Sequence, residues 1–233
     1  MRKLIYVPII HTDADLGMLV EGIEERTKAV VGSDTWQKHK EVVRLYWQEI
    51  ANFWAGKKVS GLKIFQDGMP ADGKVGESTV KSIAEKGSIN YQIIKQLIEN
   101  EAILVKTEDP ELLKEEYFLT RELTEKKSVS GSLSALFRYR QRKDTLLKAR
   151  DRYIINRIRQ SLEEGETGVC FLGAYHQVWS NLPKDIEVIL LKDPGKVREY
   201  YQKLTSNKWE KEVDRLGAYL TAPIKIEISG DDE

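Results

Sequence analysis

Short apolar runs alternate along the chain with longer stretches in which apolar residues recur at the spacing of a helix. Most of the runs are continuous, which is typical of strands buried on both faces of a parallel sheet. The predicted strands are Leu4–Ile10, Leu62–Gln66, Ala102–Lys106, Val169–Leu172 and Glu187–Leu191. A sixth run, Ile224–Ser229, alternates apolar and polar residues and is either an edge strand or lies outside the sheet. The pattern predicts an α/β fold with a mainly parallel central sheet of about five strands flanked by helices.

The stretches between the strands predict helices. The first two are an apolar stripe from Leu16 to Thr27 and a stripe with an unusually aromatic face from Trp36 to Trp54. Further helices are predicted at Glu77–Lys86, at Tyr91–Asn100 with Asn90 as its cap, and at Gly195–Leu204 and Asn207–Leu216. The stretch Leu133–Leu162, after a loop at Ser128–Gly131, predicts either one long helix or two joined ones. Core packing is the simplest interpretation of the aromatic face, and a ligand-stacking surface is the alternative. We expect one domain over residues 1–233, with a helical insertion at about 110–150 and a tail at about 195–233.

Composition and charge narrow the class of protein. The 233 residues include 37 Lys and Arg against 37 Asp and Glu, so no net field attracts nucleic acid or anionic lipid. The apolar runs are about eight residues long at most, far shorter than a membrane span. Pro8 and His11 interrupt the first run without a small-residue cleavage site after it, and Cys170, the single cysteine, excludes an intramolecular disulfide. We therefore expect a cytoplasmic protein without a nucleic-acid or membrane partner.

Two of the three histidines and several carboxylates come just after the predicted strands. His11 and Asp13 follow the first strand, Asp67 the second, Glu108 the third and His176 the fourth. The carboxyl ends of parallel strands meet at one edge of a sheet, where α/β folds bind their ligands. We therefore expect these side chains to converge. Imidazole and carboxylate ligands together suit Zn²⁺, Mn²⁺ or Fe²⁺, and the same groups can work without a metal as a general base and the carboxylate that orients it.

Some of these residues also have a structural interpretation. Asp13 can cap the helix that follows it, although the spacing His11-x-Asp13 is common in metal sites. Asp109 before Pro110 indicates a helix start, which leaves Glu108 as the group expected to face the cleft. The third histidine, His39, lies within the aromatic stripe and is expected to be structural or exposed.

Arg150 falls on a helical stripe that is otherwise apolar. The other members of the stripe are Leu147, Ile154, Ile158 and Leu162. A guanidinium on a core-facing stripe needs an anionic partner. We therefore expect Arg150 to hold either an anionic ligand or a strand-end carboxylate.

Four short motifs stand out in the sequence: Arg150–Ile154, the strand Gly168–His176 that ends in Gly-x-x-His, Pro8–His11 and Asp67–Gly68. Together they resemble the TraB/TIKI and EreA/ChaN-like superfamily. The superfamily has glycine, glutamate and asparagine at the places taken here by Pro8, Asp67 and Asp151. The resemblance implies an α/β fold with paired histidines and acids in one cleft, and site residues His11, Asp67, Arg150 and His176. Members are variously described as metal-dependent peptidase-like, esterase-like or haem-binding.

The leading hypothesis is a metal-dependent hydrolase that acts on a small-molecule or peptide substrate. Its catalytic residues would be His11, Asp67, Glu108, Arg150 and His176, and its metal ligands His11, Asp13 and His176. A bound divalent ion would help water to act as the nucleophile at neutral pH.

Two other hypotheses use the same fold. In the first, the cleft of a non-catalytic protein binds a small anionic ligand, a nucleotide or haem, with Tyr175 and Trp179 near the histidines to stack on haem. The chain has no Gly-rich phosphate loop of the P-loop or dinucleotide type. In the second, the departures at Pro8 and Asp67 mark an interaction scaffold. The aromatic helix, if exposed, would then be its interface with a partner, including a second copy of the chain.

Overall fold

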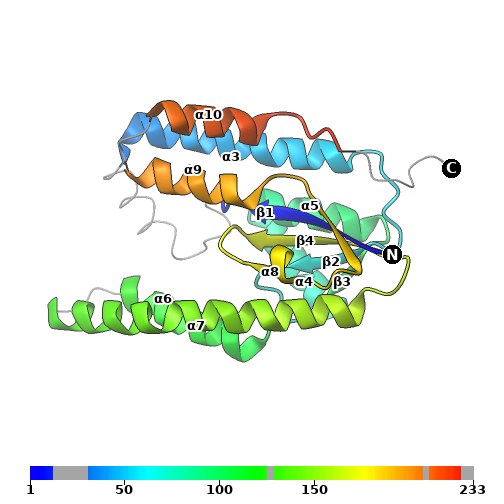
Figure 1. Cartoon of the computed structure of the whole chain (residues 1–233), viewed down its shortest axis with the longest axis horizontal. Coiled ribbons are helices and arrows are strands. Elements are labelled where there is room, and N and C mark those ends of the chain that lie inside the picture. The colour runs from blue at the N-terminus through cyan, green and yellow to red at the C-terminus, as the bar shows by residue number, and fades with distance from the viewer. Residues whose placement is uncertain (13–30, 125–128, 207–209, 227–233) are drawn as a thin grey trace.

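The computed structural model describes residues 1–12, 31–124, 129–206 and 210–226, and it confirms the α/β fold (Figure 1). Five strands form an all-parallel sheet in the order β3-β2-β4-β1-β5. The strands are β1 (Arg2–Ile9), β2 (Lys63–Gln66), β3 (Ile103–Val105), β4 (Thr167–Gly173) and β5 (Ile186–Leu190). Each begins and ends within two residues of the predicted strand.

Helices cover both faces of the sheet, which explains why its strands are continuously apolar. Ile5, Val7 and Ile9 of β1 face the first core, and Leu4 and Tyr6 face the second. The first core is closed by α3 (Ser33–Trp54), α4 (Gly73–Glu85), α5 (Ile89–Glu99), α9 (Pro194–Ser206) and α10 (Glu210–Thr221). The second is closed by α7 (Val129–Ser161) and α8 (Val178–Asn181). Figure 1 shows α3, α9 and α10 on one side of the sheet and α7 on the other.

The aromatic face of α3 packs into the first core, which confirms core packing for most of the stripe. Trp36, at the start of the stripe, also lines a cavity, so the ligand-stacking alternative stays open there. Tyr46 and Trp47 are fully buried. Trp47 Nε1 donates to the carbonyl oxygen of Ile10 at 2.8 Å, and the Tyr46 hydroxyl donates to that of Pro8. These two bonds fix the end of β1 immediately before His11.

α6 (Pro110–Thr124) and the first half of α7 pack side by side beyond the edge of the sheet (Figure 1). Arg142 of α7 pairs with Glu115 of α6, and Arg138 pairs with Glu122. Of the two alternatives for this stretch, the structure shows one long helix and not two joined ones. The predicted loop is wrong over 129–131, because α7 begins at Val129. The low helix propensity of Ser and Gly is only a weak predictor of where a helix begins.

Three smaller expectations can also be compared with the structure. The cap of α5 is Ser88, whose Oγ accepts from the N–H of Tyr91, and Asn90 lies inside the helix. Residues 224–226 form no strand, and Ile224 and Ile226 pack half-buried on the first core instead. The predicted helix at 16–27, residue 13 and residues 227–229 lie outside the described residues. Among the described helices, none has both the length and the apolar character needed to cross a bilayer.

Candidate functional site

A buried arginine on α7 lies at the centre of the site. Arg150 is 4% exposed and forms ion pairs with three carboxylates. Its Nε and Nη2 donate to the two oxygens of Glu108, Nη2 also donates to Oδ1 of Asp67 at 2.6 Å, and Nη1 donates to Oε2 of Glu116. The arginine on the apolar stripe therefore does have anionic partners. The two-pronged bond to Glu108 is the geometry in which guanidinium–carboxylate pairs are strongest.

Asp67 directly continues β2 and lies against the end of β4. Its backbone N–H donates to the carbonyl oxygen of Phe171 at 2.8 Å, and its Oδ2 accepts from the N–H of Gly173 at 3.0 Å. A Cβ at position 173 would lie 3.2 Å from that oxygen, which is tighter than ordinary van der Waals contact. The glycine that opens the segment Gly-x-x-His therefore allows the two strand ends to approach each other.

Backbone hydrogen bonds fix Glu108 just after β3. The N–H groups of Thr107 and Glu108 both donate to the carbonyl oxygen of Met69, at 2.9 and 3.0 Å. Thr107 Oγ1 also accepts from the N–H of Gln66 at 3.0 Å, which ties the ends of β2 and β3 together. The Glu108 side chain is fully buried against Arg150 and does not line the cavity. The expectation that Glu108 faces the cleft is therefore wrong.

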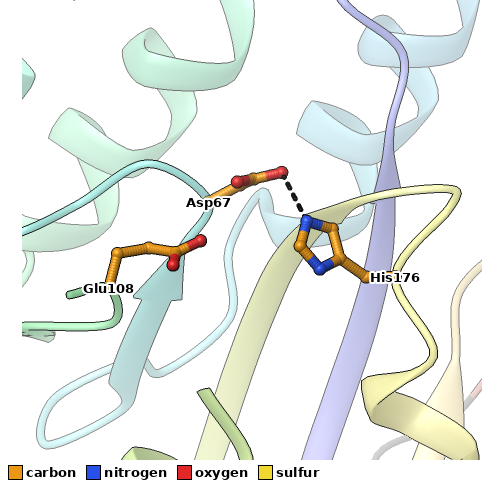
Figure 2. Close-up of side chains that lie close together, drawn as sticks. All are labelled: Asp67, Glu108 and His176. Carbon is orange, nitrogen blue, oxygen red and sulfur yellow. Dashed lines mark ion pairs between the residues drawn. The ribbon is translucent and has the colours of Figure 1, made fainter. Parts of the chain in front are cut away.

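His176 is held with one ring nitrogen bound and the other facing Asp67. It closes a turn in which its N–H donates to the carbonyl oxygen of Gly173 at 3.1 Å. Its Nδ1 lies 2.5 Å from Oδ1 of Asp151, whose Oδ2 accepts from the N–H of Gln177 at 2.9 Å. Its Nε2 lies 3.5 Å from Oδ2 of Asp67 (Figure 2). Asp151 thus fixes the orientation of the ring.

Burial and the charges of the cluster together shift the pKa values of three of its members. Burial of Asp67 favours its neutral form, but the positive charges of His176 and Arg150 outweigh burial and hold its pKa well below the usual range. Burial of His176 would lower its pKa, but the charge of Asp67 and the bond to Asp151 raise it to about 10. Burial raises the pKa of Glu108 to about 7, despite its bonds to Arg150. Without a metal, the site therefore contains an imidazolium at neutral pH.

The cluster opens into a cavity of about 1040 Å³. Its lining includes Asp67, Glu116, Arg150 and His176 of the cluster, the aromatic residues Trp36, Tyr91, Tyr175 and Tyr201, and His11.

His11 is exposed on the cavity wall, outside the cluster, and residue 13 lies outside the described part of the chain. Trp179 packs against the second core instead of lining this cavity, so it does not provide the stacking surface for haem that we expected.

Asp67, Glu108 and His176 can hold a metal ion. One ligand atom from each lies within 4.8 Å of the others. Two ligands bound at ~2.1 Å to a tetrahedral ion are ~3.4 Å apart, close to the 3.5 Å between Asp67 Oδ2 and His176 Nε2. The carboxylate on Nδ1 of His176 is a typical outer partner of a metal-bound histidine. Because Arg150 binds both oxygens of Glu108, the Asp67 and His176 atoms are the most available ligands.

Sequence reasoning missed three residues that shape the site. Asp151 follows Arg150 in the segment that resembles an Arg-Asn motif, and this adjacency was the available signal. Glu116 is one of several glutamates of α6, and nothing in the sequence distinguishes it. Arg198 of α9 donates two hydrogen bonds, of 3.2 and 2.8 Å, to the carbonyl oxygen of Ala174, and so supports the turn that carries His176.

No protein-family model, curated protein or solved structure matches the chain. The resemblance of its four motifs to the TraB/TIKI and EreA/ChaN-like superfamily therefore stays a prediction from the sequence.

Proposed function

We propose that the chain is a hydrolase that binds a divalent metal ion, Zn²⁺, Mn²⁺ or Fe²⁺, through Asp67 and His176. The observation that carries this proposal is the pair formed by Asp67 Oδ2 and His176 Nε2, which face each other at 3.5 Å beside the cavity. A bound divalent ion acts as a Lewis acid and makes water a better nucleophile at neutral pH.

The surrounding residues give each ligand its orientation. Asp151 accepts from Nδ1 of His176 and leaves Nε2 as the ligand atom. Arg150 binds Oδ1 of Asp67 and leaves Oδ2 toward His176. The same guanidinium neutralises Glu108, which has no contact with water. Arg150 therefore acts as a positioning residue in this proposal, and Glu108 anchors Arg150.

The cavity indicates the size of the substrate. Pockets for small molecules and cofactors occupy roughly 300–1,000 Å³, and this cavity of about 1040 Å³ is slightly larger than the upper limit of that range. Its aromatic walls suit a ligand with flat apolar surfaces. A small molecule or a short peptide fits this description.

Metal-free acid–base hydrolysis is the second candidate, and one observation favours it. The pKa of His176, raised to about 10, makes it an imidazolium at neutral pH, which can donate a proton to the leaving group as water attacks the scissile bond. The neutral imidazole that remains can take up the proton that the attacking water releases. Arg150 would then supply the positive charge that the first proposal assigns to a metal ion. The two candidates predict opposite responses to a chelator.

A screen for hydrolysis tests the proposal. Purified protein is treated with EDTA, reloaded with Zn²⁺, Mn²⁺ or Fe²⁺, and assayed on chromogenic esters, amides and fluorogenic peptides. We expect hydrolysis only after metal loading, and a loss of about two orders of magnitude or more in Asp67→Asn and His176→Ala. The visible absorption spectrum of the same sample, with and without added haem, tests the haem alternative.

His39→Ala is the matched control. His39 is a buried histidine of the same cavity, 6% exposed, but it bonds to the Tyr200 hydroxyl at 3.0 Å and lies outside the cluster. We expect this variant to keep its metal-dependent activity. Full activity in EDTA would contradict the metal-dependent proposal and support acid–base hydrolysis. Equal activity of His176→Ala and His39→Ala would contradict both candidates.

A further inference from the structure

Two sides of the Arg150 guanidinium bind carboxylates that differ in their exposure to water. Arginine has five N–H donors. Three of them, one on Nε and two on Nη2, bind Glu108 and Asp67, whose side chains are 0% and 15% exposed. Among the described residues, Nη1 donates only to Glu116, whose side chain is 44% exposed. The Nη1 edge is therefore the one whose partner has access to water.

Glu116 differs from the other two carboxylates in its origin. Asp67 and Glu108 follow strands of the sheet, and backbone hydrogen bonds fix their segments. Glu116 comes from α6, outside the sheet, and reaches Arg150 with a flexible side chain. An ion pair with one partner in water is weak compared with a buried pair. Glu116 is therefore the partner that another anion can replace most easily.

The cavity gives such an anion access to Arg150. Arg150 and Glu116 both line it, together with Leu113 of α6 and Leu147 of α7. An incoming carboxylate that takes the place of Glu116 leaves the number of anions on Arg150 unchanged, so no new counter-charge is needed. Asp67, which Arg150 also binds, faces His176 in the same cavity. A ligand held at Nη1 is therefore anchored next to the proposed reactive pair.

We propose that the Nη1 edge of Arg150 is the binding site for a carboxylate of the substrate, and that Glu116 occupies this site when no substrate is bound. The inference rests on the proposed function for its assignment of the ligand as substrate. It narrows the substrate class to molecules that have a carboxylate beside an apolar or aromatic body, such as peptides with a free carboxyl end. Leu113 and Leu147 contact the apolar part.

Benzoate is a suitable probe, because it combines a carboxylate with a flat apolar ring. Isothermal titration in EDTA compares the full-length wild type with Glu116→Ala. Glu115→Ala is the matched control, because Glu115 lies on the same helix but pairs with Arg142 away from the cavity lining. We expect Glu116→Ala to bind benzoate about tenfold more tightly than the wild type and Glu115→Ala. Benzamide, which has the same shape without the charge, should bind all three proteins equally.

Equal benzoate affinity in the wild type and Glu116→Ala would overturn the inference, as would the absence of detectable benzoate binding by Glu116→Ala. An equal gain for benzamide would also overturn it, because the substitution would then only enlarge an apolar space. The titration requires neither metal nor turnover. A negative benzoate titration would therefore not contradict the proposed metal-dependent hydrolase. Conversely, a protein whose activity survives EDTA could still bind benzoate at Arg150.

Discussion

Replacing Arg150 by methionine tests whether the buried carboxylates depend on its charge. Methionine keeps most of the length of the side chain but removes the cation from Glu108, which is fully buried, and from Asp67, which is 15% exposed. Removing one partner of a buried ion pair lowers stability by about 3–5 kcal/mol, because the remaining charge has neither water nor a counter-ion. We expect Arg150→Met to lower the free energy of unfolding by this amount at about pH 8.

The loss should become smaller as the pH falls. Burial raises the pKa of Glu108 to about 7 even with Arg150 present. Without Arg150 that pKa rises further, so at about pH 5.5 the carboxyl group is neutral and needs no cation. At about pH 8, a second substitution, Glu108→Gln, should return about 2 kcal/mol to the Arg150→Met protein, because the uncompensated charge is then absent.

Urea unfolding followed by circular dichroism measures these changes. Arg142→Met is the control, since Arg142 lies on the same helix but is half exposed and pairs with Glu115 at the surface. We expect its unfolding midpoint to equal that of the wild type. A loss below about 1 kcal/mol in Arg150→Met would show that the buried carboxylates do not depend on this cation. No recovery on adding Glu108→Gln would show the same.

Three further predictions concern stability and metal binding. The pKa of His176 in the folded protein, about 10, lies above its ordinary value of 6.5. The stabilisation that protonated His176 contributes is therefore complete below pH 6.5 and is lost as the pH rises through about 10. Urea unfolding of the metal-free protein should show this fall in stability, and an equal fall in His176→Asn would contradict it. Gly76→Ala should lower the free energy of unfolding by about 1–3 kcal/mol, because the added Cβ would lie 2.6 Å from the carbonyl oxygen of Ala71; an unchanged melting temperature would refute this. Arg198→Met frees the turn before His176 and should weaken zinc binding about tenfold in a calorimetric titration, whereas wild-type affinity would show that the turn needs no such support.

The sheet could be predicted because strands buried on both faces are continuously apolar in the sequence. Three of the site residues followed from the same reasoning, since Asp67, Glu108 and His176 come after β2, β3 and β4, which are neighbours in the sheet. Arg150 could be found because a cation on an apolar stripe requires a partner. His11 follows β1 and reaches the cavity, but it stays exposed outside the cluster.

The rest of the site depends on how helices cross the sheet, which the sequence does not reveal. Asp151 is one position from Arg150 and therefore about 100° around the helix. Both residues reach the strand ends only because α7 lies across the second face. Glu116 reaches Arg150 because α6 packs against α7, and its spacing does not distinguish it from Glu111, Glu115 or Glu122.

Zinc titration by isothermal calorimetry, with wild type, His176→Ala and the control His39→Ala in parallel, measures whether His176 holds a metal ion. We expect one zinc ion per chain in the wild type and in His39→Ala, and no measurable binding in His176→Ala. Zinc binding by His176→Ala as tight as that of the wild type, or no binding by the wild type, would contradict this expectation.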